Sequence, residues 1–473
     1  MFDDDDEYLE DDQAYMEMLL QRFDNIKNGV AGGLLDEDEF EKVAEYFFQT
    51  NNEEQALLAC DIARTYYPFS ASVLLLKAEI LTNGQKYGQA LKVLDELDTH
   101  DAHNLESVLL RADILVSQFR HDAAAALLES EAPHFKGREW IELSLELADV
   151  YDEGEDFEKV FDTLKKVLSV APRQEEALQK ICFWAEFTGR LEESVEIHTE
   201  LTDKDPYNAL AWFNLGAAYQ GLKLWEKAID AYEFCVAIDE NFEFAYRNMA
   251  DAYMRLKWYE RAIEVLEKHL EIAKPEDVIY EAMGYCWEKQ KNFSKARYYY
   301  RQASHLSPQD DGIFFKIGET YAREQDWEKA ARAFGIALNL DKENASYCMA
   351  LGNCLMAMEA TSEALVCYLN AVRLKPANKT TWTTLIRGLY LGGYYEEALT
   401  QLEFAREHLG DKPDLRYYDA ALLLEMGKSK EALLQLETAL RGAPKRLKTF
   451  TDLNPDYLRR SAVTELVARY KRG

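Results

Sequence analysis

The sequence lacks most of the features that point to catalysis, export or nucleic-acid binding. It has only 54 basic side chains against 86 acidic ones, a formal net charge of −32, and a strongly acidic chain repels phosphate backbones and anionic lipid surfaces. No run approaches the roughly 18 uninterrupted apolar residues of a membrane-spanning helix. The acidic N-terminus also lacks the positive segment of a secretory signal. These absences predict a cytoplasmic protein that does not bind nucleic acid or insert into membranes.

Cysteine and catalytic motifs are equally sparse. The seven cysteines are an odd number without a CxxC pair, which favours small buried thiols in a reducing compartment over disulfides. The sequence contains no HExxH, Walker-loop, GxGxxG or GxSxG motif. His100 and His103 lie near Asp98 and Asp101, but a solvated polar turn explains this spacing better than a metal site does. We therefore expect no enzymatic activity, no cofactor and no bound metal.

A 34-residue period organises the chain. With residues 209–242 as the type copy, steps of 34 residues keep the register from 37 to 446, apart from a two-residue slip around 133–137. Twelve copies and this insertion fill the 410 residues of 37–446. Position 20 is alanine in ten copies, at Ala56, Ala90, Ala124, Ala228, Ala262, Ala296, Ala330, Ala364, Ala398 and Ala432. Such a period indicates a solenoid of helix pairs that bury their apolar faces against their neighbours.

Each repeat position has a physical role. Large residues at positions 4, 7 and 11 share one face of a first helix, and small residues at positions 8 and 20 let the second helix approach closely. The type copy has these landmarks at Trp212, Leu215, Gly216, Tyr219 and Ala228, with Tyr232 at position 24. With this pattern the chain resembles the tetratricopeptide-repeat (TPR) family over residues 37–446. The resemblance implies an all-α fold, a right-handed α-solenoid (the TPR superhelix) of antiparallel helix pairs.

The two ends differ from the repeat array. Residues 1–36 hold eleven acids against two bases, and an apolar stripe predicts a helix over about 12–27 that caps the first repeat. The first dozen residues are expected to be disordered. Residues 447–473 are expected to hold a basic helix over about 456–471 that caps the last repeat.

The resemblance implies that first helices line a concave groove through positions 2, 5, 6, 9, 12 and 13. Copies 1 to 5 place thirteen acids and two bases there, whereas copies 6 to 12 place six of each. We therefore predict a non-enzymatic scaffold whose groove, acidic in its N-terminal half and mixed in its C-terminal half, binds a protein or peptide segment. Asparagine amides hold peptide backbones, arginines clamp carboxylates and aromatic rings receive apolar anchors. The candidate peptide-binding residues are Asn214, Arg247, Asn248, Arg255, Tyr285, Lys316 and Arg387.

Two other interpretations remain open. The acidic half is equally explained by solvated helices of an acidic chain, whose charges pair across turns. Alternatively, the acidic segment 1–36 and the basic segment 441–473, with nine bases against three acids, predict a structural protein that self-assembles head to tail. The two-carboxylate clamp by which some TPR proteins bind chaperone C-termini is not matched, because no copy has lysine at its fifth position.

Overall fold

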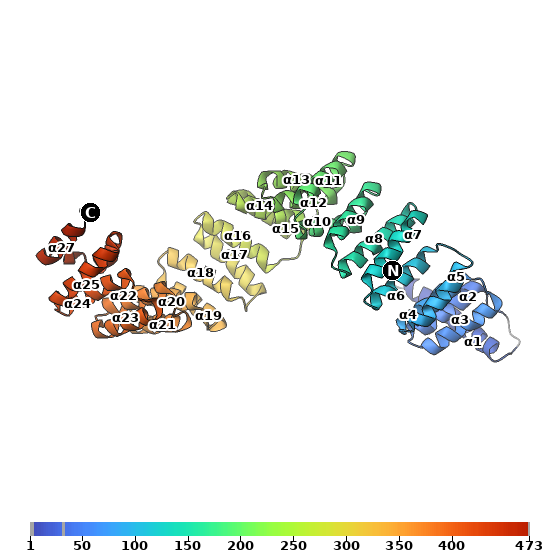
Figure 1. Ribbon diagram of the computed structural model, residues 1–473, viewed down its shortest axis with the longest axis horizontal. Coiled ribbons are helices and arrows are strands. Elements are labelled where there is room, and N and C mark those ends of the chain that lie inside the picture. Colours follow the sequence, from blue (N-terminus) through green and yellow to red (C-terminus); the bar gives the residue numbers. More distant parts are fainter. Residues whose placement is uncertain (1–3, 31–33, 472–473) are drawn as a thin grey trace. The chain divides into compact units, whose positions relative to one another are not determined.

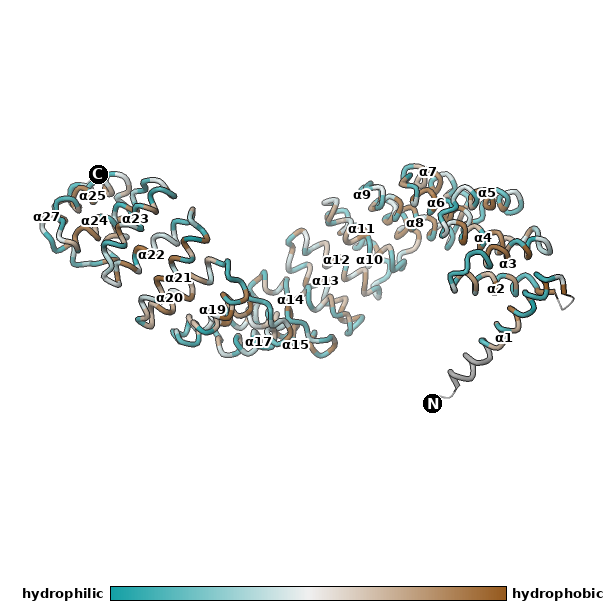
Figure 2. Tube along the Cα trace, turned by 90° about the horizontal axis from the view of Figure 1, so that it is seen from below, coloured by the Kyte–Doolittle hydropathy of each residue, from teal (hydrophilic) through white to brown (hydrophobic). Residues whose placement is uncertain are grey.

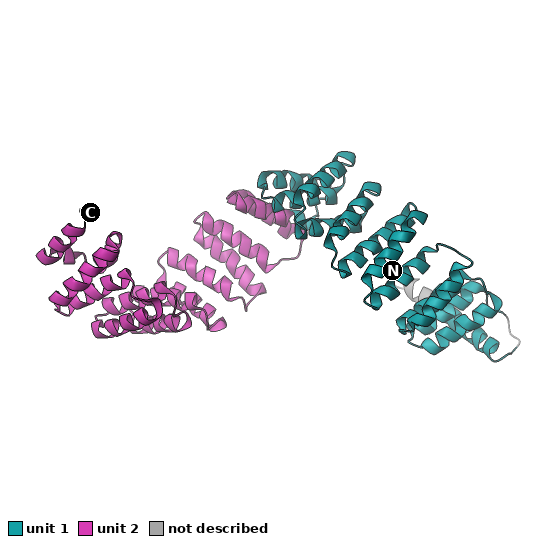
Figure 3. Ribbon diagram, viewed as in Figure 1, with its two compact units in different colours: residues 1–245 teal, residues 246–473 magenta. Residues whose placement is uncertain are grey.

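The regular structure of the chain consists of helices. The computed structural model describes residues 4–30 and 34–471, with side chains over 13–30 and 34–470, and every regular element in these ranges is helical (Figure 1). The chain divides into two compact units, unit 1 (Met1–Ala245) and unit 2 (Tyr246–Gly473) (Figure 3). None of the helices in the described ranges is long and apolar enough to cross a bilayer. The predicted all-α class is confirmed.

Unit 1 begins with one helix and continues with helix pairs. Its helices are α1 (Asp4–Lys27), α2 (Glu37–Gln49), α3 (Glu53–Tyr66), α4 (Ala71–Asn83), α5 (Tyr87–Asp98), α6 (Leu105–Ser117), α7 (His121–Glu131), the short 3₁₀ helix η1 (Ala132–His134), α8 (Arg138–Glu153), α9 (Phe157–Val170), α10 (Glu175–Phe187), α11 (Leu191–Lys204), α12 (Ala209–Gly221) and α13 (Trp225–Ile238). The next helix, α14 (Glu243–Arg255), crosses the division between the units.

Unit 2 continues the alternation of first and second helices. Its remaining helices are α15 (Tyr259–Ile272), α16 (Asp277–Lys289), α17 (Phe293–Leu306), α18 (Asp311–Arg323), α19 (Trp327–Leu340), α20 (Ala345–Ala357), α21 (Thr361–Leu374), α22 (Lys379–Leu391), α23 (Tyr395–Leu409), α24 (Pro413–Glu425), α25 (Ser429–Gly442), η2 (Pro444–Arg446), α26 (Lys448–Thr451), η3 (Pro455–Arg459) and α27 (Ser461–Lys471).

Each pair packs as an antiparallel hairpin, and neighbouring pairs share their cores. Helix α12 packs against α13 in unit 1, and α16 packs against α17 in unit 2. First helices also contact first helices: α2 contacts α4, α4 contacts α6, and α6 contacts α8. Hydrophobic and hydrophilic segments alternate along the coloured trace, as expected for helices that bury one face (Figure 2).

The backbone repeats together with the sequence. The residue at position 15, just after the first helix, has a φ between 56° and 78° in every copy. These residues are Asn51, Gln85, Phe119, Glu155, Gly189, Lys223, Lys257, Lys291, Gln325, Glu359, Gly393 and Gly427. A left-handed residue at this place ends a helix and starts the turn to the next one. The same turn therefore joins the two helices of each pair.

Small and aromatic positions set the spacing of the helices. All ten position-20 alanines are at most 2% exposed, which agrees with their predicted place in the helix crossing. Tryptophan at position 4 joins consecutive pairs, because Nε1 of Trp212 donates to the carbonyl oxygen of Pro206 at 2.9 Å. Trp382 makes the same bond to Pro376 at 2.7 Å.

The N-terminal helix is longer than predicted. Helix α1 begins at Asp4, so the expected disorder is wrong for residues 4–12, while residues 1–3 lie outside the described ranges. In the later part of α1, Leu19 and Phe23 are fully buried in one core cluster with Phe40 of α2.

The C-terminal helix is shorter than predicted. Residues 455–459 form the 3₁₀ helix η3, and α27 begins only at Ser461, so the helix expected from 456 is wrong over its first turn. The hydroxyl of Tyr457 explains this difference. It lies 2.7 Å from the hydroxyl of Tyr390 and 3.2 Å from the carbonyl oxygen of Ala421, which holds η3 against the preceding helices.

Candidate functional site

Four first helices of unit 1 carry an acid at the same repeat position. Helices α2, α4, α6 and α8 contact one another in order, and their position-9 residues are Glu45, Glu79, Asp113 and Asp149. Glu146 lies on α8 three residues before Asp149. We call these five residues the acidic row.

Burial and mutual repulsion raise the pKa of several carboxyl groups in the acidic row. Burial is the largest cause for Glu146, and the charges of Asp113 and Asp149 add to it, so that its pKa rises to about 7. Burial, with the neighbouring charge of Glu45, also raises the pKa of Glu79. The row therefore holds its negative charge at a cost in free energy that a nearby cation relieves.

Internal ion pairs neutralise only one end of the acidic row. Lys180 of α10 donates to both carboxylate oxygens of Asp149, at 2.6 and 2.9 Å. The other lysine predicted on this surface, Lys42, instead places its Nζ 5.4 Å from the ring centre of Tyr15. Within the part of the chain that the structure describes, Asp149 is the only row member in an ion pair. Ion pairing across turns therefore does not account for the four other acids of the acidic row.

A pocket of about 650 Å³ lies between α10 and α12 of unit 1. We call it the aromatic pocket, because three of its lining residues are Phe213, Phe242 and Phe244. The ring centres of Phe213 and Phe242 are 5.0 Å apart, and Phe244 is 54% exposed. Polar lining is supplied by Arg173, Glu175, Gln179, Tyr207, Asn208, Asn214 and Asp239. An apolar pocket of about 300–1,000 Å³ with a few polar groups is the usual form of a ligand site.

Asn214 lines the aromatic pocket but uses its amide within the fold. The residue is 1% exposed, and its Nδ2 donates to the carbonyl oxygen of Leu178 at 2.6 Å. This bond joins α12 to the first helix of the preceding pair. We therefore assign Asn214 to holding α12 against α10, where the sequence had suggested contact with a peptide.

The six other candidate residues lie in unit 2. They are Arg247, Asn248 and Arg255 on α14, Tyr285 on α16, Lys316 on α18 and Arg387 on α22. The Nη1 of Arg247 lies 3.8 Å from Oε2 of Glu276, and the Nε of Arg255 lies 3.3 Å from Oδ1 of Asp251. Both arginine side chains are more than half exposed, at 52% and 61%. Exposed pairs of this kind contribute about 0–1 kcal/mol, so they compete weakly with an incoming carboxylate.

Helices α16 and α18 bring opposite charges together. Lys316 forms an ion pair with Glu281, and the Nζ of Lys289 lies 4.8 Å from the ring centre of Tyr285. Burial raises the pKa of Glu319, and the cations Lys289 and Lys316 oppose that rise. Lys316 therefore serves the internal charge balance of unit 2.

Arg387 has a different environment. It lines a pocket of about 330 Å³ together with Asn353 and Tyr368, whose hydroxyl donates to Oδ1 of Asn353 at 2.9 Å. No ion pair to Arg387 forms within residues 34–470. Among the candidate cations, Arg387 is thus the one that forms no ion pair with a carboxylate within these residues.

The aromatic pocket includes residues that the sequence analysis missed. Tyr207 and Phe242 lie at positions 33 and 34, in the turns between pairs, which the groove positions do not include. The available signal was the gathering of Phe213, Phe242 and Phe244 within less than the length of one repeat.

Models of the tetratricopeptide repeat match this chain at residues 209–242 and 245–275. A model of the second ARM domain of tetratricopeptide repeat protein 21 matches residues 327–469. Human tetratricopeptide repeat protein 21B is 26% identical over 133 aligned positions, and the match covers 26% of this chain and 10% of that protein. The chain thus matches only a small part of its curated relative.

Solved TPR structures resemble parts of the chain. YrrB, described as a TPR protein with an unusual peptide-binding site, is 20% identical, with 40% of this chain and 96% of YrrB covered at a TM-score of 0.35. The C-terminal part of a TPR protein from Cytophaga hutchinsonii is 15% identical, with 54% and 99% covered at a TM-score of 0.44. The matched repeat models and the in-register helix pairs identify the chain as a member of the tetratricopeptide-repeat proteins.

Proposed function

We propose that this chain is a non-enzymatic scaffold that binds a cationic protein segment with an apolar anchor on the first helices of unit 1. Tetratricopeptide-repeat proteins typically act as scaffolds for protein–protein interaction. The aromatic pocket carries the proposal, because it is a preformed pocket of about 650 Å³ in which three phenylalanine residues lie beside polar groups of α10, α12 and the adjoining turns. Its size fits a side chain together with part of its backbone.

The acidic row supplies the charge preference. Burial, and then the charges of Asp113 and Asp149, raise the pKa of Glu146 to about 7, so a lysine or arginine of a partner relieves a cost already present in the unbound chain. Charges on an open surface mainly speed the encounter and select the partner. They are screened beyond about 10 Å at 0.1 M salt, so the interaction is expected to weaken as salt increases.

The aromatic pocket supplies the apolar contact. Phe244 and Tyr207 are 54% and 81% exposed, and a large apolar side chain bound beside them removes that surface from water. Buried aromatic contacts of this kind carry most of the binding energy in protein interfaces. The acidic row thus speeds the encounter with the partner, and the aromatic pocket supplies most of the binding energy that retains it.

Unit 2 offers a second, mixed surface that we assign to the same role. Arg247, Arg255 and Arg387 fit partner carboxylates, while Asn248 and Tyr285 fit a peptide backbone and an apolar side chain. Arg387 is the strongest of these candidates because it lines a pocket and no described carboxylate pairs with it.

The proposal is tested by affinity capture with three versions of the full chain at low and high salt. One is the native chain, and the second carries Glu45→Gln, Glu79→Gln, Asp113→Asn and Asp149→Asn. The third is a matched control with the same change of charge on second helices. It replaces the exposed position-18 acids, as Glu54→Gln, Asp122→Asn, Glu192→Gln and Glu226→Gln.

A partner that binds the native chain and the control, leaves at high salt and is lost from the row variant supports the proposal. Equal loss from the row variant and the control would refute a specific acidic row and leave only nonspecific charge attraction. Recovery of the chain alone, with a mass in light scattering that falls as salt rises, would favour head-to-tail self-association instead.

A further inference from the structure

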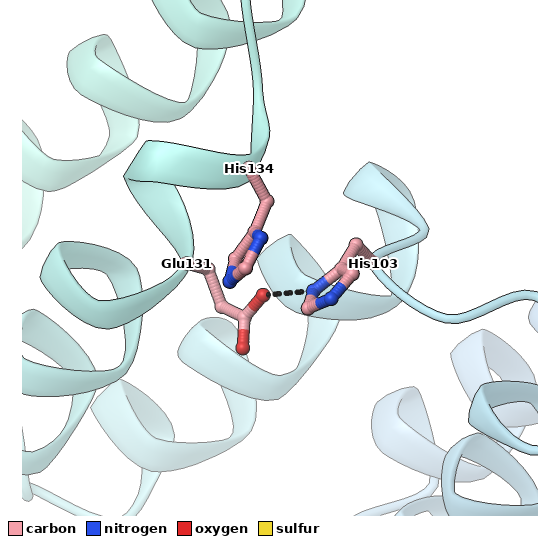
Figure 4. Close-up of side chains that lie close together, drawn as sticks. All are labelled: His103, Glu131 and His134. Atoms are coloured by element: carbon pink, nitrogen blue, oxygen red, sulfur yellow. Dashed lines mark hydrogen bonds and ion pairs between the residues drawn. The ribbon is translucent and has the colours of Figure 1, made fainter.

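Three metal-ligating side chains meet in unit 1 outside the surfaces described above (Figure 4). His103 lies in the turn between α5 and α6, Glu131 is the last residue of α7, and His134 is the last residue of η1. Nδ1 of His103 lies 2.8 Å from Oε2 of Glu131, and the imidazole rings of His103 and His134 stack with centres 3.7 Å apart. One ligand atom from each residue lies within 4.8 Å of the others.

The single interruption of the repeat period creates this cluster. The two-residue slip around 133–137 folds as η1 after α7, and Phe135 of the same segment is only 6% exposed. Anchored in this way, the insertion turns His134 toward His103, which belongs to the preceding repeat (Figure 4). No other copy has this insertion, so the cluster occurs once in the array.

The backbone at His103 has an unusual conformation. Its φ is +64°, and within the described ranges it is the only non-glycine residue with a positive φ outside position 15 of the repeats. Left-handed conformations are uncommon for residues other than glycine, although asparagine, aspartate and histidine adopt them more readily than most. This conformation distinguishes the turn at His103 from the other turns between consecutive pairs, where no described non-glycine residue has a positive φ.

The composition of the cluster fits a particular class of metal. Two imidazoles and one carboxylate form a ligand set typical of Zn²⁺ and related transition metals, and three protein ligands leave a position for water. Tetrahedral ligands at about 2.1 Å from zinc are about 3.4 Å apart. The three side chains are exposed or half-buried, so small rotations bring ligand atoms now within 4.8 Å to that spacing.

A simple ion pair accounts for less of the arrangement. A hydrogen bond between His103 and Glu131 explains that contact, but it leaves the second imidazole stacked beside the first without a role. A cation bound by the carboxylate and by both imidazoles, once the rings turn out of their stack, gives all three side chains a role.

We propose that His103, Glu131 and His134 bind one divalent transition-metal ion of the zinc class. The ion ties the turn before α6 to the insertion after α7 and so holds two consecutive repeats together at the point where the period slips. Metal coordination that joins distant turns stabilises the folded chain.

The test is titration of the metal-free full chain with Zn²⁺, followed by calorimetry and by thermal unfolding. The variants are His134→Gln, Glu131→Gln and His103→Asn, because asparagine tolerates the left-handed backbone at 103. His100→Gln is the matched control, since His100 lies in the same turn but stacks edge-on against Phe69 at 4.7 Å. Circular dichroism verifies that each variant keeps its helices.

We expect one Zn²⁺ per chain and a higher unfolding temperature with metal. Each of the three variants should weaken binding by at least about 10-fold, while His100→Gln leaves it unchanged. Co²⁺ bound in place of Zn²⁺ should give visible absorption bands that disappear in His134→Gln. Absence of Zn²⁺ binding, or binding that is equal in the native chain and in folded His134→Gln, would overturn the proposal.

Discussion

Gly318 of α18 lies directly against the ring of Phe334 of α19. A methyl group added to Gly318 would lie 2.6 Å from both Cδ1 and Cε1 of that ring, closer than real Cβ contacts. The same contact between positions 8 and 24 recurs in the pairs Gly216 and Tyr232, Gly284 and Tyr300, and Gly352 and Tyr368. The missing side chain at position 8 therefore makes room for the aromatic ring at position 24.

Replacing Gly318 with alanine should destabilise unit 2. The new methyl group must displace the fully packed ring of Phe334, and overpacking of this kind costs about 1–3 kcal/mol. Urea unfolding followed by circular dichroism measures the change in the free energy of unfolding.

Gly335→Ala is the matched control on the adjacent helix α19. A methyl group there meets no atom within 4 Å, and alanine is favoured over glycine inside a helix by about 0.5–1 kcal/mol. The two glycine-to-alanine changes should therefore have opposite signs. A stabilising Gly318→Ala would mean that the ring moves freely and that close packing at position 8 is not required.

Much of the fold could be predicted because each repeat position has one local task. The repeat period predicted the order of the helices, and the small residues at positions 8 and 20 predicted the close packing of the two helices in each pair. The copy with Ile386 at position 8 was harder, since glycine or alanine is expected there. In the structure Ile386 is fully buried, and Gly388 provides the close approach to the ring of Tyr368 from the preceding pair.

The candidate sites were less predictable, because they depend on contacts between copies. The bond from Asn214 to Leu178 requires the exact offset of two helices, which a periodic pattern does not encode. The aromatic pocket uses turn residues such as Phe242, and the approach of His134 to His103 depends on the irregular segment η1. The repeat period predicts the features that every copy shares, whereas these sites depend on contacts and segments that are particular to one or two copies.

Glu146→Gln should stabilise unit 1 at alkaline pH. The pKa of Glu146 rises from 4.5 to about 7 in the folded chain, mainly through burial and then through the charges of Asp113 and Asp149. A carboxyl group whose folded pKa is raised stabilises the fold when protonated, and this stability is lost as pH rises through 7. The neutral amide avoids that loss, so the gain should be present at pH 8 and shrink toward pH 5. Thermal unfolding at several pH values measures it.

Glu142→Gln provides the comparison on the same helix α8. Glu142 is exposed, and its substitution removes the same charge as Glu146→Gln does. The comparison therefore isolates the effect of a general reduction in negative charge. A similar gain at pH 8 from both substitutions would show that total charge, and not the surroundings of Glu146, sets the effect.

His198→Leu should protect unit 1 from acid. The imidazole of His198 is fully buried, neither nitrogen has a hydrogen-bond partner within the described ranges, and burial lowers its pKa from 6.5 to about 3. A histidine with a lowered folded pKa contributes stability above pH 6.5 that is lost as pH falls toward 3, by about 1.4 kcal/mol per pH unit for one proton. Leucine cannot take up that proton.

Urea midpoints of the native chain and His198→Leu at pH 7, 5 and 4 measure this effect. The difference between them should grow as pH falls, while His100→Leu, at an exposed position of unit 1, should follow the native chain. Parallel loss of stability in all three chains would assign the acid sensitivity to other groups.

Lys316→Glu and Arg387→Glu should separate folding from binding in unit 2. Lys316 pairs with Glu281 and opposes the raised pKa of Glu319, so a glutamate there breaks an ion pair and adds repulsion, and we expect a loss of about 1 kcal/mol. Arg387 has no carboxylate partner within residues 34–470, so its replacement should change stability by less than about 0.5 kcal/mol.

The same two variants test the mixed surface, because they reverse equal charges on first helices. If partner carboxylates bind Arg387, then Arg387→Glu weakens capture of the partner at unchanged unfolding temperature. We expect Lys316→Glu to weaken capture only in proportion to its loss of folding stability. Lys316→Gln is the check, because it removes the positive charge without adding repulsion from a new carboxylate. Full binding by folded Arg387→Glu would exclude this surface and leave the acidic row and the aromatic pocket of unit 1 as the place where a partner binds.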